Sequence, residues 1–408
     1  MLTDRNDPSS SRPATVFLSY ARKDEQAILS LERALQERGV RVLRDKPSLP
    51  LGAHNAERLT AMIDAECDAV LFYVTRRLLE SDFIWRYEVP AAVARRNREA
   101  NFHIIPVFQG VEYSDLAVQS ADRGLPSLAD FNAERVKKRL PSLEESARIA
   151  RRTLNSALGL RLGRDGTQQQ PTVICLHTFP YTPSATHLHL DIDWTASHEN
   201  GPSVEQWRDE LLPALNDVAD ALALQGRGVV DVWLKARLPA AIALGYTFPA
   251  KGSVTLHLRN ERAEWSCNGP SEDTGDFIVT STMLDRKQAT AIVEVAISRE
   301  TTAAVTRWRR TAEYVPGWRM LCAPAGGPSR DALTTGTQAR TWARRIGDEV
   351  RRLWDAEGVN DVHLFLASTV EFAAMVGQQL RGRRRVHVYY GDNEEGYRLA
   401  YTLGPEGV

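Results

Sequence analysis

The sequence has 408 residues, of which 43% are hydrophobic and 25% are charged, and this composition is typical of a folded globular protein with two or three domains. A formal net charge of −1 argues against a protein that coats extended nucleic acid, so we expect no DNA partner and at most a small nucleotide ligand in a local pocket. The four cysteines form no CxxC pair and no run of about eighteen apolar residues occurs, which predicts a cytoplasmic protein with free thiols, no bound metal and no membrane partner.

The first domain is predicted from alternating strand and helix patterns. Polar residues fill positions 1–13, which we expect to be disordered, and the apolar strand patterns TVFLSY, VRVLRD, AVLFYV and HIIPVF follow. Helical patterns alternate with these strands at Asp24–Arg38, Asn55–Glu66 and Trp85–Arg96. The alternation predicts an α/β domain whose parallel sheet is covered by helices on both faces and binds ligands at the carboxyl ends of its strands. The domain should end near residue 157, because GLRLGRDGTQQQP predicts a linker over residues 158–171.

A candidate catalytic group occurs in SDFIWRYEVP, residues 81–90. Trp85 and Glu88 are three residues apart on one helical face, so a carboxylate stands beside a large aromatic ring. If this face borders the cleft at the strand ends, the carboxylate can stabilise an oxocarbenium-like centre or orient water at a sugar carbon, which is the chemistry of glycosidic-bond cleavage. The alternative is that Trp85 anchors the helix to the sheet while Glu88 pairs with a surface arginine.

Three segments of the first domain resemble TIR domains in order and spacing. They are FLSY followed by ARKD, Asp45 leading into the loop KPSLPLG at residues 46–52, and SDFIWRYEV. The resemblance covers residues 14–157 and implies a flavodoxin-like fold, with the loop in the place of the family's BB loop. Many bacterial TIR domains cleave NAD+ with the glutamate of a WCxxEL-like motif, which implies Glu88 as the catalytic residue and the following substrate-binding residues: Ser19, Tyr20, Asp45 and Trp85. Arg86 replaces the cysteine of that motif and Val89 replaces its leucine.

Residues 172–408 contain an internal repeat. DVWLKARLPAAIALG (231–245) and DVHLFLASTVEFAAMVG (361–377) are each a strand, a polar turn and a small-residue-rich helix that ends in glycine, and beyond the glycines the register holds at a constant offset of 132 positions. Upstream, we align ATHLHLDIDW with ATAIVEVAIS. Two such copies should pack as pseudo-twofold halves, about residues 172–262 and 263–408, with a cleft lined by the two equivalent turns.

The two turns supply candidate ligand-binding residues. Lys235 and Arg237 follow one strand, while Ser368 and Thr369 begin a helix after the other, and cationic side chains with a helix N-terminus suit an anion. Aromatic side chains near the same strand ends could stack on bases, namely Trp233, Phe365, Tyr390 and Tyr401. The alternatives are that Ser368 or Thr369 only caps its helix, that Lys235 is solvated, and that the aromatic rings belong to the core.

ALGYTF (243–248) and HLFLAST (363–369) resemble the SAVED domain, a fused pair of CARF-like halves that bind cyclic oligonucleotides. The chain thus resembles the TIR–SAVED effectors of bacterial cyclic-oligonucleotide-based antiphage signalling systems (CBASS). This resemblance implies that a cyclic trinucleotide, cyclic tri-AMP, binds the second domain and drives self-association into oligomers or filaments, which complete a TIR active site that hydrolyses NAD+.

Two other functions remain open. One is a non-catalytic TIR scaffold with a ligand-sensing C-terminal domain. The other is a C-terminal half that hydrolyses its own ligand, which is disfavoured because no Ser-His-Asp, metal-ligand or phosphate-loop pattern occurs there and His363 lies inside a predicted strand.

Overall fold

The computed structural model describes residues 12–44, 55–123, 125–164, 170–182, 187–250, 252–259, 264–270, 276–312, 314–392 and 396–405. The chain divides into two compact units. The first comprises residues 1–175, 184–193 and 220–226, and the second comprises residues 176–183, 194–219 and 227–408.

The first unit contains a five-stranded sheet with the order β2-β1-β3-β4-β5, in which all paired strands are parallel. Its strands are β1 (Thr15–Ser19), β2 (Arg41–Arg44), β3 (Ala69–Val74), β4 (His103–Gln109) and β5 (Glu134–Val136). This order is that of a flavodoxin-like fold, as predicted. All five residues of β1 are buried, because helices cover the sheet on both sides.

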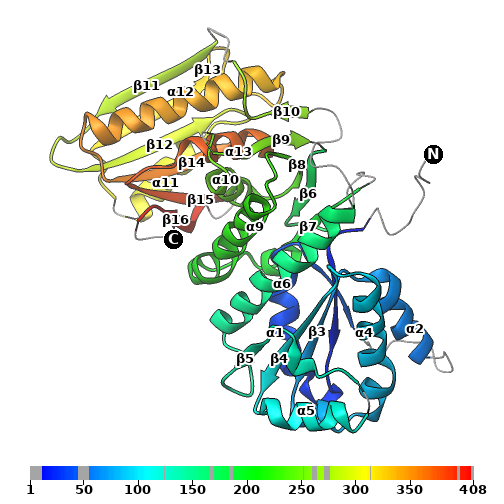
Figure 1. Ribbon diagram of the computed structural model, residues 1–408. Helices are drawn as coiled ribbons and strands as arrows, with labels where there is room; N and C mark the ends of the chain where they lie inside the picture. Colours follow the sequence, from blue (N-terminus) through cyan, green and yellow to red (C-terminus); the bar gives the residue numbers. More distant parts are fainter. Residues whose placement is uncertain are drawn as a thin grey trace, which may run out of the picture. The chain divides into compact units, whose positions relative to one another are not determined.

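Helices α1 and α6 lie on one face of this sheet, and α2 and α4 lie on the other (Figure 1). The helices of this unit are α1 (Glu25–Gln36), α2 (Asn55–Ala61), α3 (Arg76–Leu79), α4 (Val89–Arg98), α5 (Tyr113–Ala121) and α6 (Leu143–Arg164), with 3-10 turns at Arg22–Asp24 and Leu128–Asp130 and π-helical turns at Met62–Glu66 and Ile84–Glu88.

The predicted linker begins too early. Helix α6 continues without a break through residues 158–164, because Leu158, Leu160 and Leu162 are buried and keep the helix against the core. Gly159 and Gly163 were among the residues that predicted a linker, but both are helical residues of α6.

The second sheet has the order β10-β9-β8-β6-β7. Its strands are β6 (Thr172–His177), β7 (Leu190–Asp193), β8 (Val229–Lys235), β9 (Thr255–Arg259) and β10 (Glu264–Ser266). The helices between these strands are α7 (Thr195–His198), α8 (Val204–Gln206), α9 (Leu212–Leu224) and α10 (Leu238–Thr247), with a π-helical turn at Trp207–Leu211.

The third sheet has the order β11-β13-β12-β14-β15-β16. Its inner strands are parallel, and the edge strands β11 and β16 are antiparallel to their neighbours. Its elements are β11 (Phe277–Met283), β12 (Thr290–Ala296), α11 (Thr302–Thr311), β13 (Trp318–Pro324), α12 (Gly336–Asp355), β14 (Asp361–Ala367), α13 (Val370–Gln379), β15 (Arg385–Asp392) and β16 (Gly396–Leu403).

The predicted repeat is present, and its two glycines lie at the contact between the equivalent helices α10 and α13. A Cβ atom on Gly245 would overlap the carbonyl oxygen of Ala374, and a Cβ atom on Gly377 would overlap the carbonyl oxygen of Ile242. Gly245 and Gly377 differ by 132 positions, as do Ile242 and Ala374, so each half makes the same contact with the other. The helix pair therefore has the pseudo-twofold symmetry that the sequence predicts, and glycine is needed because the backbones touch.

Two details of the repeat alignment are wrong. The strand beside β8 is β6, so β6 rather than ATHLHLDIDW is the counterpart of β12, which lies beside β14. ATHLHLDIDW instead supplies β7 at the sheet edge, and its alternating pattern alone could not distinguish an edge strand from an inner one. The boundary at residue 262 is also too early, because β10 pairs with β9 in the second sheet.

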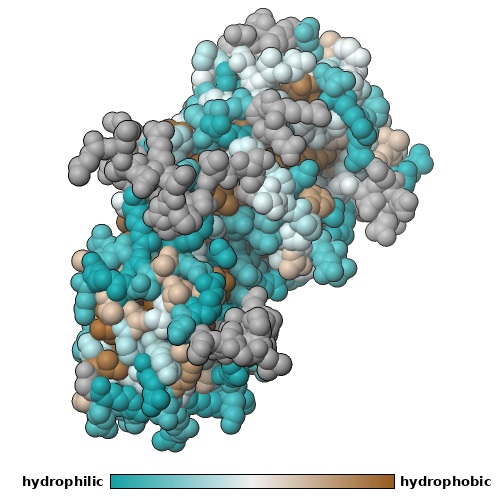
Figure 2. Space-filling view, turned by 90° about the vertical axis from the view of Figure 1, so that its right-hand side faces the viewer, coloured by the Kyte–Doolittle hydropathy of each residue, from teal (hydrophilic) through white to brown (hydrophobic). Residues whose placement is uncertain are grey.

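The side chains of the core are mainly aliphatic and aromatic, and the face in Figure 2 is largely hydrophilic, with apolar residues in small separate patches. Among the described residues, no helix is both long and apolar enough to span a membrane.

Candidate functional site

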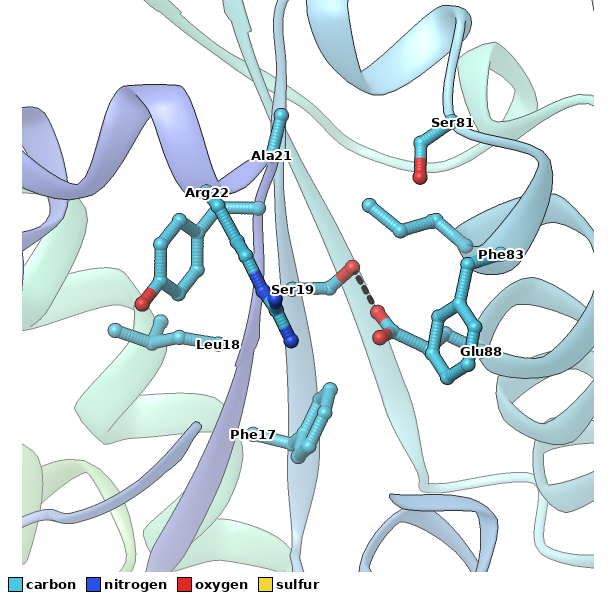
Figure 3. Close-up of a pocket in the computed structure, with 10 residues that line it drawn as sticks. Phe17, Leu18, Ser19, Ala21, Arg22, Ser81, Phe83 and Glu88 are labelled. Atoms are coloured by element: carbon cyan, nitrogen blue, oxygen red, sulfur yellow. Dashed lines mark hydrogen bonds between the residues drawn. The ribbon is translucent and has the colours of Figure 1, made fainter. Parts of the chain in front are cut away.

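A cavity of about 350 Å³ lies at the carboxyl end of β1. Its walls come from β1, from the turn that follows it, and from the segment that leads into α4; the lining residues are Phe17, Leu18, Ser19, Tyr20, Ala21, Arg22, Ser81, Phe83, Ile84 and Glu88. The Ser19 hydroxyl donates a hydrogen bond to Glu88 Oε2 at 2.5 Å (Figure 3). The structure therefore brings the predicted Ser19 and Glu88 together at the strand-end cavity.

Glu88 is held by a π-helical turn that ends before a proline. The backbone N–H of Val89 donates to the carbonyl of Ile84, five residues back, while Pro90 follows without an N–H. In a regular α-helix the proline ring would clash with the carbonyl of Arg86, so the wider turn relieves that clash. A second turn of this kind occurs where Leu212 donates to Trp207 and Pro213 follows, whereas the π-helical turn at Met62–Glu66 is followed by Cys67 and has no proline.

Arg22 and Phe83 complete the cavity, and sequence reasoning missed both. In Figure 3, Arg22 extends toward Ser19, and Phe83 lies beside the Glu88 carboxylate. The cavity thus offers a buried carboxylate, a hydroxyl, an aromatic ring and a guanidinium, which suit a sugar with a nearby phosphate. The sequence signal for Arg22 was its place two residues after the end of FLSY, whereas Phe83 had no signal beyond its closeness to Trp85.

Trp85 does not line this cavity, which corrects its prediction as a substrate-binding residue. The indole is buried in the core, and its Nε1–H donates to the carbonyl of Leu79 at 3.1 Å. The Arg123 guanidinium lies over the ring at 5.1 Å from its centroid. The alternative role, an anchor of the helix to the sheet, fits these contacts.

Of the other two predicted substrate-binding residues, Tyr20 and Asp45, the structure describes only Tyr20. Tyr20 lines the cavity, but its hydroxyl accepts a hydrogen bond from Arg44 Nη1 at 3.0 Å, and burial raises the pKa of this phenol. Asp45 and the loop 46–52 lie outside the described residues.

In the second unit, a cavity of about 380 Å³ contains two arginines. Its lining residues are Glu199, Asn200, Gly201, Arg237, Tyr390, Gly391, Gly396, Tyr397 and Arg398. Arg237 is the N-cap residue of α10, and its guanidinium lies 5.0 Å from the centroid of the Phe179 ring. Arg398 lies 5.1 Å from the Tyr390 ring centroid and packs against Gly201, where a Cβ would displace its Nη2. This cavity combines two guanidinium groups with the rings of buried Tyr390 and half-buried Tyr397, and cationic groups beside aromatic rings suit an anionic nucleotide.

Only two of the residues predicted for the ligand pocket line this cavity, Arg237 and Tyr390. Lys235 is exposed at the end of β8, outside the lining. Thr369 caps α13 by accepting a hydrogen bond from the N–H of Phe372, and the Ser368 hydroxyl donates to the carbonyl of Thr369, so neither faces Arg237 across the cavity. The expectation that the two turns line one cleft is therefore not met by this cavity.

Phe365 and Tyr401 are core residues, which corrects their prediction as stacking platforms. Phe365 is 0% exposed and packs against Trp308, Tyr389 and Tyr397. Tyr401 is 1% exposed, and its hydroxyl donates to the carbonyl of Pro239 at 2.6 Å. Their rings are covered on both faces, so they cannot stack on a base.

A buried hydrogen-bond chain orients Tyr390 toward the cavity. His198 Nδ1 lies 3.0 Å from the carbonyl of Trp194, so this nitrogen carries the proton and Nε2 accepts from the Tyr390 hydroxyl at 3.2 Å. The same hydroxyl accepts from Trp207 Nε1 at 3.0 Å. Burial lowers the pKa of His198 to about 4, which keeps the ring neutral and preserves this direction of donation near neutral pH.

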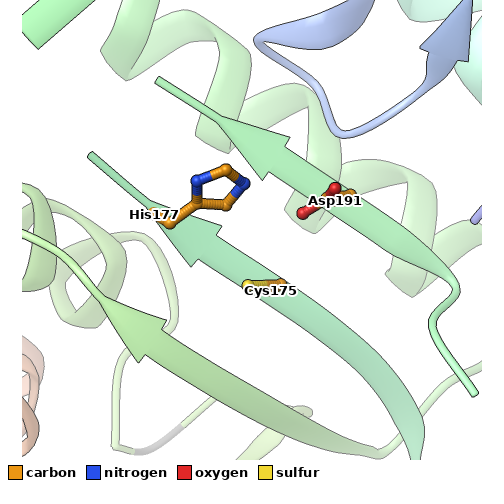
Figure 4. Close-up of side chains that lie close together, drawn as sticks. All are labelled: Cys175, His177 and Asp191. Carbon is orange, nitrogen blue, oxygen red and sulfur yellow. The ribbon is translucent and has the colours of Figure 1, made fainter. Parts of the chain in front are cut away.

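One group of side chains has the chemistry of metal ligands. Cys175, His177 and Asp191, on β6 and β7, each place a ligand atom within 4.8 Å of the other two (Figure 4). Where no ion is bound, burial and nearby carboxylates raise the pKa of the Cys175 thiol.

Family comparisons agree with the two folds. The TIR domain model matches residues 16–138. The model described as "SMODS-associated and fused to various effectors sensor domain", SAVED, matches residues 214–403. No curated protein sequence matches the chain.

Two solved structures with similar folds are of the Acinetobacter baumannii Cap4 SAVED/CARF-domain containing receptor, one with the cyclic trinucleotide 3′3′3′-cAAA and one with 2′3′3′-cAAA. They are 13% and 12% identical to this chain, each with a TM-score of 0.51, and each alignment covers 88% of this chain and 100% of the receptor. At this identity the likeness shows the fold alone. The two family matches and this shared fold show that the chain has an N-terminal TIR domain and a C-terminal SAVED domain of the CARF-like fold.

Proposed function

We propose that this protein is an NAD+ hydrolase of antiphage defence whose activity is switched on by a cyclic trinucleotide. The observation that carries the catalytic part is the buried Glu88 carboxylate, hydrogen-bonded by Ser19 in the wall of a cavity at a strand end. The sensor part is supported by the SAVED match and by the fold shared with receptors whose structures contain cyclic tri-AMP.

The proposed reaction breaks the bond between ribose C1′ and the nicotinamide nitrogen. The bonding electron pair leaves with the ring as neutral nicotinamide, and positive charge develops on C1′ and the ring oxygen of the ribose. The Glu88 carboxylate stabilises this charge, while the Ser19 hydroxyl fixes one carboxylate oxygen. Water then attacks C1′ and loses a proton to solvent, which gives ADP-ribose. Arg22 provides a cation for the diphosphate.

The proposed activator site is the arginine-containing cavity of the SAVED domain. Arg237 and Arg398 would bind phosphates, and Tyr390 and Tyr397 would contact bases. Binding would favour head-to-tail self-association into oligomers or filaments, in which neighbouring TIR domains complete the active site.

The catalytic proposal is tested with Glu88→Gln and a matched control, Asp82→Asn. Asp82 is exposed, lies six residues before Glu88 and does not line the cavity. With cyclic tri-AMP present, Glu88→Gln should lose NAD+ cleavage while Asp82→Asn keeps it, as measured by nicotinamide release. Turnover by Glu88→Gln near that of the wild type would reject the assignment. A complete absence of turnover in the wild type would favour the non-catalytic scaffold.

The sensor proposal is tested with the double variant Arg237→Ala/Arg398→Ala against Lys235→Ala. Each change removes exposed positive charge, but Lys235 lies outside the cavity. Binding of cyclic tri-AMP, measured by calorimetry, should weaken strongly in the double variant and change little in Lys235→Ala. Sedimentation with the activator should show large assemblies for the wild type. Equal affinities for the two variants would place the site elsewhere.

A further inference from the structure

Cys175, His177 and Asp191, the group with the chemistry of metal ligands, lie on two neighbouring strands of the second sheet. Cys175 and His177 are two residues apart on β6, so their side chains leave the same face of the strand. Asp191 lies on β7, the next strand of the sheet, and the three ligand atoms lie within 4.8 Å of one another (Figure 4). Around one tetrahedral zinc ion such atoms lie about 3.3–3.6 Å apart. Small side-chain rotations therefore close the group around an ion.

The imidazole of His177 is oriented like that of a metal ligand. Its Nδ1 lies 3.1 Å from the carbonyl oxygen of Phe179, so Nδ1 carries the proton and donates to that oxygen. The lone pair is then on Nε2, and in Figure 4 the outer edge of the ring points toward Asp191. A histidine that binds a metal through one ring nitrogen almost always donates the other N–H to a carbonyl or carboxylate. This hydrogen bond is evidence for a ligand role that is independent of the clustering of the three side chains.

The charges and atom types of the group favour zinc. Cys175 and His177 are buried and Asp191 is half-buried. A thiolate, a carboxylate and a neutral imidazole carry two negative charges, so one Zn²⁺ makes the site neutral, as a buried position requires. Sulfur and nitrogen ligands favour Zn²⁺ over Mg²⁺ or Ca²⁺, which prefer oxygen. The fourth position is left to water or to the carboxylate of Asp193, which is exposed two residues after Asp191 on the same strand.

We propose that Cys175, His177 and Asp191 bind one Zn²⁺ ion that joins β6 to the edge strand β7. Binding forms one bond each to sulfur, nitrogen and oxygen, and the proton of the Cys175 thiol goes to solvent, so nothing is oxidised or reduced. The sequence predicted no metal because the cysteines form no CxxC pair. The third ligand comes from a separate strand, and only sheet pairing brings it beside the other two.

Two chains of contacts connect the proposed zinc site to the arginine-containing cavity. The carbonyl of Phe179 accepts the His177 Nδ1–H, and the Phe179 ring contacts the Arg237 guanidinium. The carbonyl of His177 accepts from the N–H of Trp194 at 2.9 Å, and the Trp194 ring stacks on His198, which orients the tyrosine of the cavity. Removal of zinc should therefore weaken the binding of cyclic tri-AMP. This consequence, unlike the zinc site itself, rests on the proposed function.

Zinc binding is tested on the full-length, untagged protein with Cys175→Ser, Asp191→Asn and the control Cys322→Ser. Cys322 is also buried, but it lies on β13 of the third sheet. After treatment with EDTA, addition of Zn²⁺ and desalting, mass spectrometry should find about one zinc ion per chain in the wild type and in the control. The other two variants should bind Zn²⁺ more than about 100-fold more weakly, because loss of a residue that only supports a ligand already costs about 10- to 100-fold.

Cobalt and thermal unfolding give readouts that do not depend on activity. Co²⁺ should produce a thiolate-to-cobalt charge-transfer band in the near ultraviolet for the wild type and Cys322→Ser, and no such band for Cys175→Ser. Zn²⁺ should raise the melting temperature of the wild type but not that of Asp191→Asn, whose fold is checked by circular dichroism.

The zinc site is overturned by a wild type that binds no zinc, by a cobalt band that survives Cys175→Ser, or by variants that keep the zinc content of the wild type. Unchanged affinity for cyclic tri-AMP after zinc removal would overturn only the connection to the cavity. A protein that binds zinc but no cyclic tri-AMP would contradict the proposed function and support the zinc site.

Discussion

The contact between α10 and α13 allows the effect of one methyl group to be worked out. In Gly377→Ala, the new Cβ would lie 3.0 Å from both the Cα and the carbonyl carbon of Ile242 and would overlap the carbonyl oxygen. Because the obstacle is helix backbone, the two helices must move apart. Such overpacking costs about 1–3 kcal/mol. Replacing a helical glycine by alanine recovers about 0.5–1 kcal/mol, so we expect a net loss of about 1–2 kcal/mol.

The matched control is Gly163→Ala, also in a helix, where a Cβ would meet no atom within 4 Å. This change should leave stability unchanged or raise it by up to about 1 kcal/mol. Urea unfolding followed by circular dichroism measures both variants. Gly245→Ala should resemble Gly377→Ala, and the double variant should lose less than the sum, because helices already moved apart accommodate both methyl groups. A Gly377→Ala protein as stable as the wild type would refute the backbone contact.

Three further predictions concern the two sites. Pro90→Ala permits a regular helix, so Glu88 should shift and NAD+ turnover should fall on the order of 10- to 100-fold with little change in KM; unaltered kinetics would contradict the role of the proline. Tyr390→Phe leaves His198 and Trp207 without their buried partner, so the unfolding free energy should fall by roughly 1–3 kcal/mol in urea titrations, and activator affinity should decrease in calorimetry. Because burial lowers the pKa of His198 from 6.5 to about 4, the unfolded chain binds a proton between these pH values that the native chain does not. Stability of the second unit should therefore fall as pH decreases through this window, by up to about 1.4 kcal/mol per pH unit for this group, and a flat profile of unfolding midpoint against pH would contradict it.

Periodicity and turn residues were sufficient for the features that depend on local pattern. The buried run at β1 and the small-residue-rich helices α10 and α13 follow from the spacing of apolar and small residues, although both helices continue two residues beyond Gly245 and Gly377, where they were predicted to end. Glu88 was predicted as the catalytic residue from the resemblance to TIR domains, beside its spacing from Trp85, and the structure places its side chain in the wall of the cavity at the end of β1.

The errors arose where the outcome depends on packing between distant segments. Trp85, Phe365 and Tyr401 are aromatic residues near strand ends, and the sequence could not show that neighbouring elements cover both faces of their rings. Arg398 lies on β16, beyond the two aligned turns, and reaches the second cavity only because β16 pairs with β15. Such residues have no local signal, since their partners are fixed by sheet order.

The proline that follows Glu88 has a consequence for the proposed control of NAD+ hydrolysis. The ring of Pro90 fixes its own φ angle and removes a backbone N–H, so the backbone turn that carries Glu88 is set when the chain folds. The proposed messenger would then change which groups can reach the Glu88 carboxylate, or which groups lie opposite it. It would not change the backbone turn that holds the carboxylate. In the proposed function, a copy without the messenger would already hold the Glu88 carboxylate in the cavity wall.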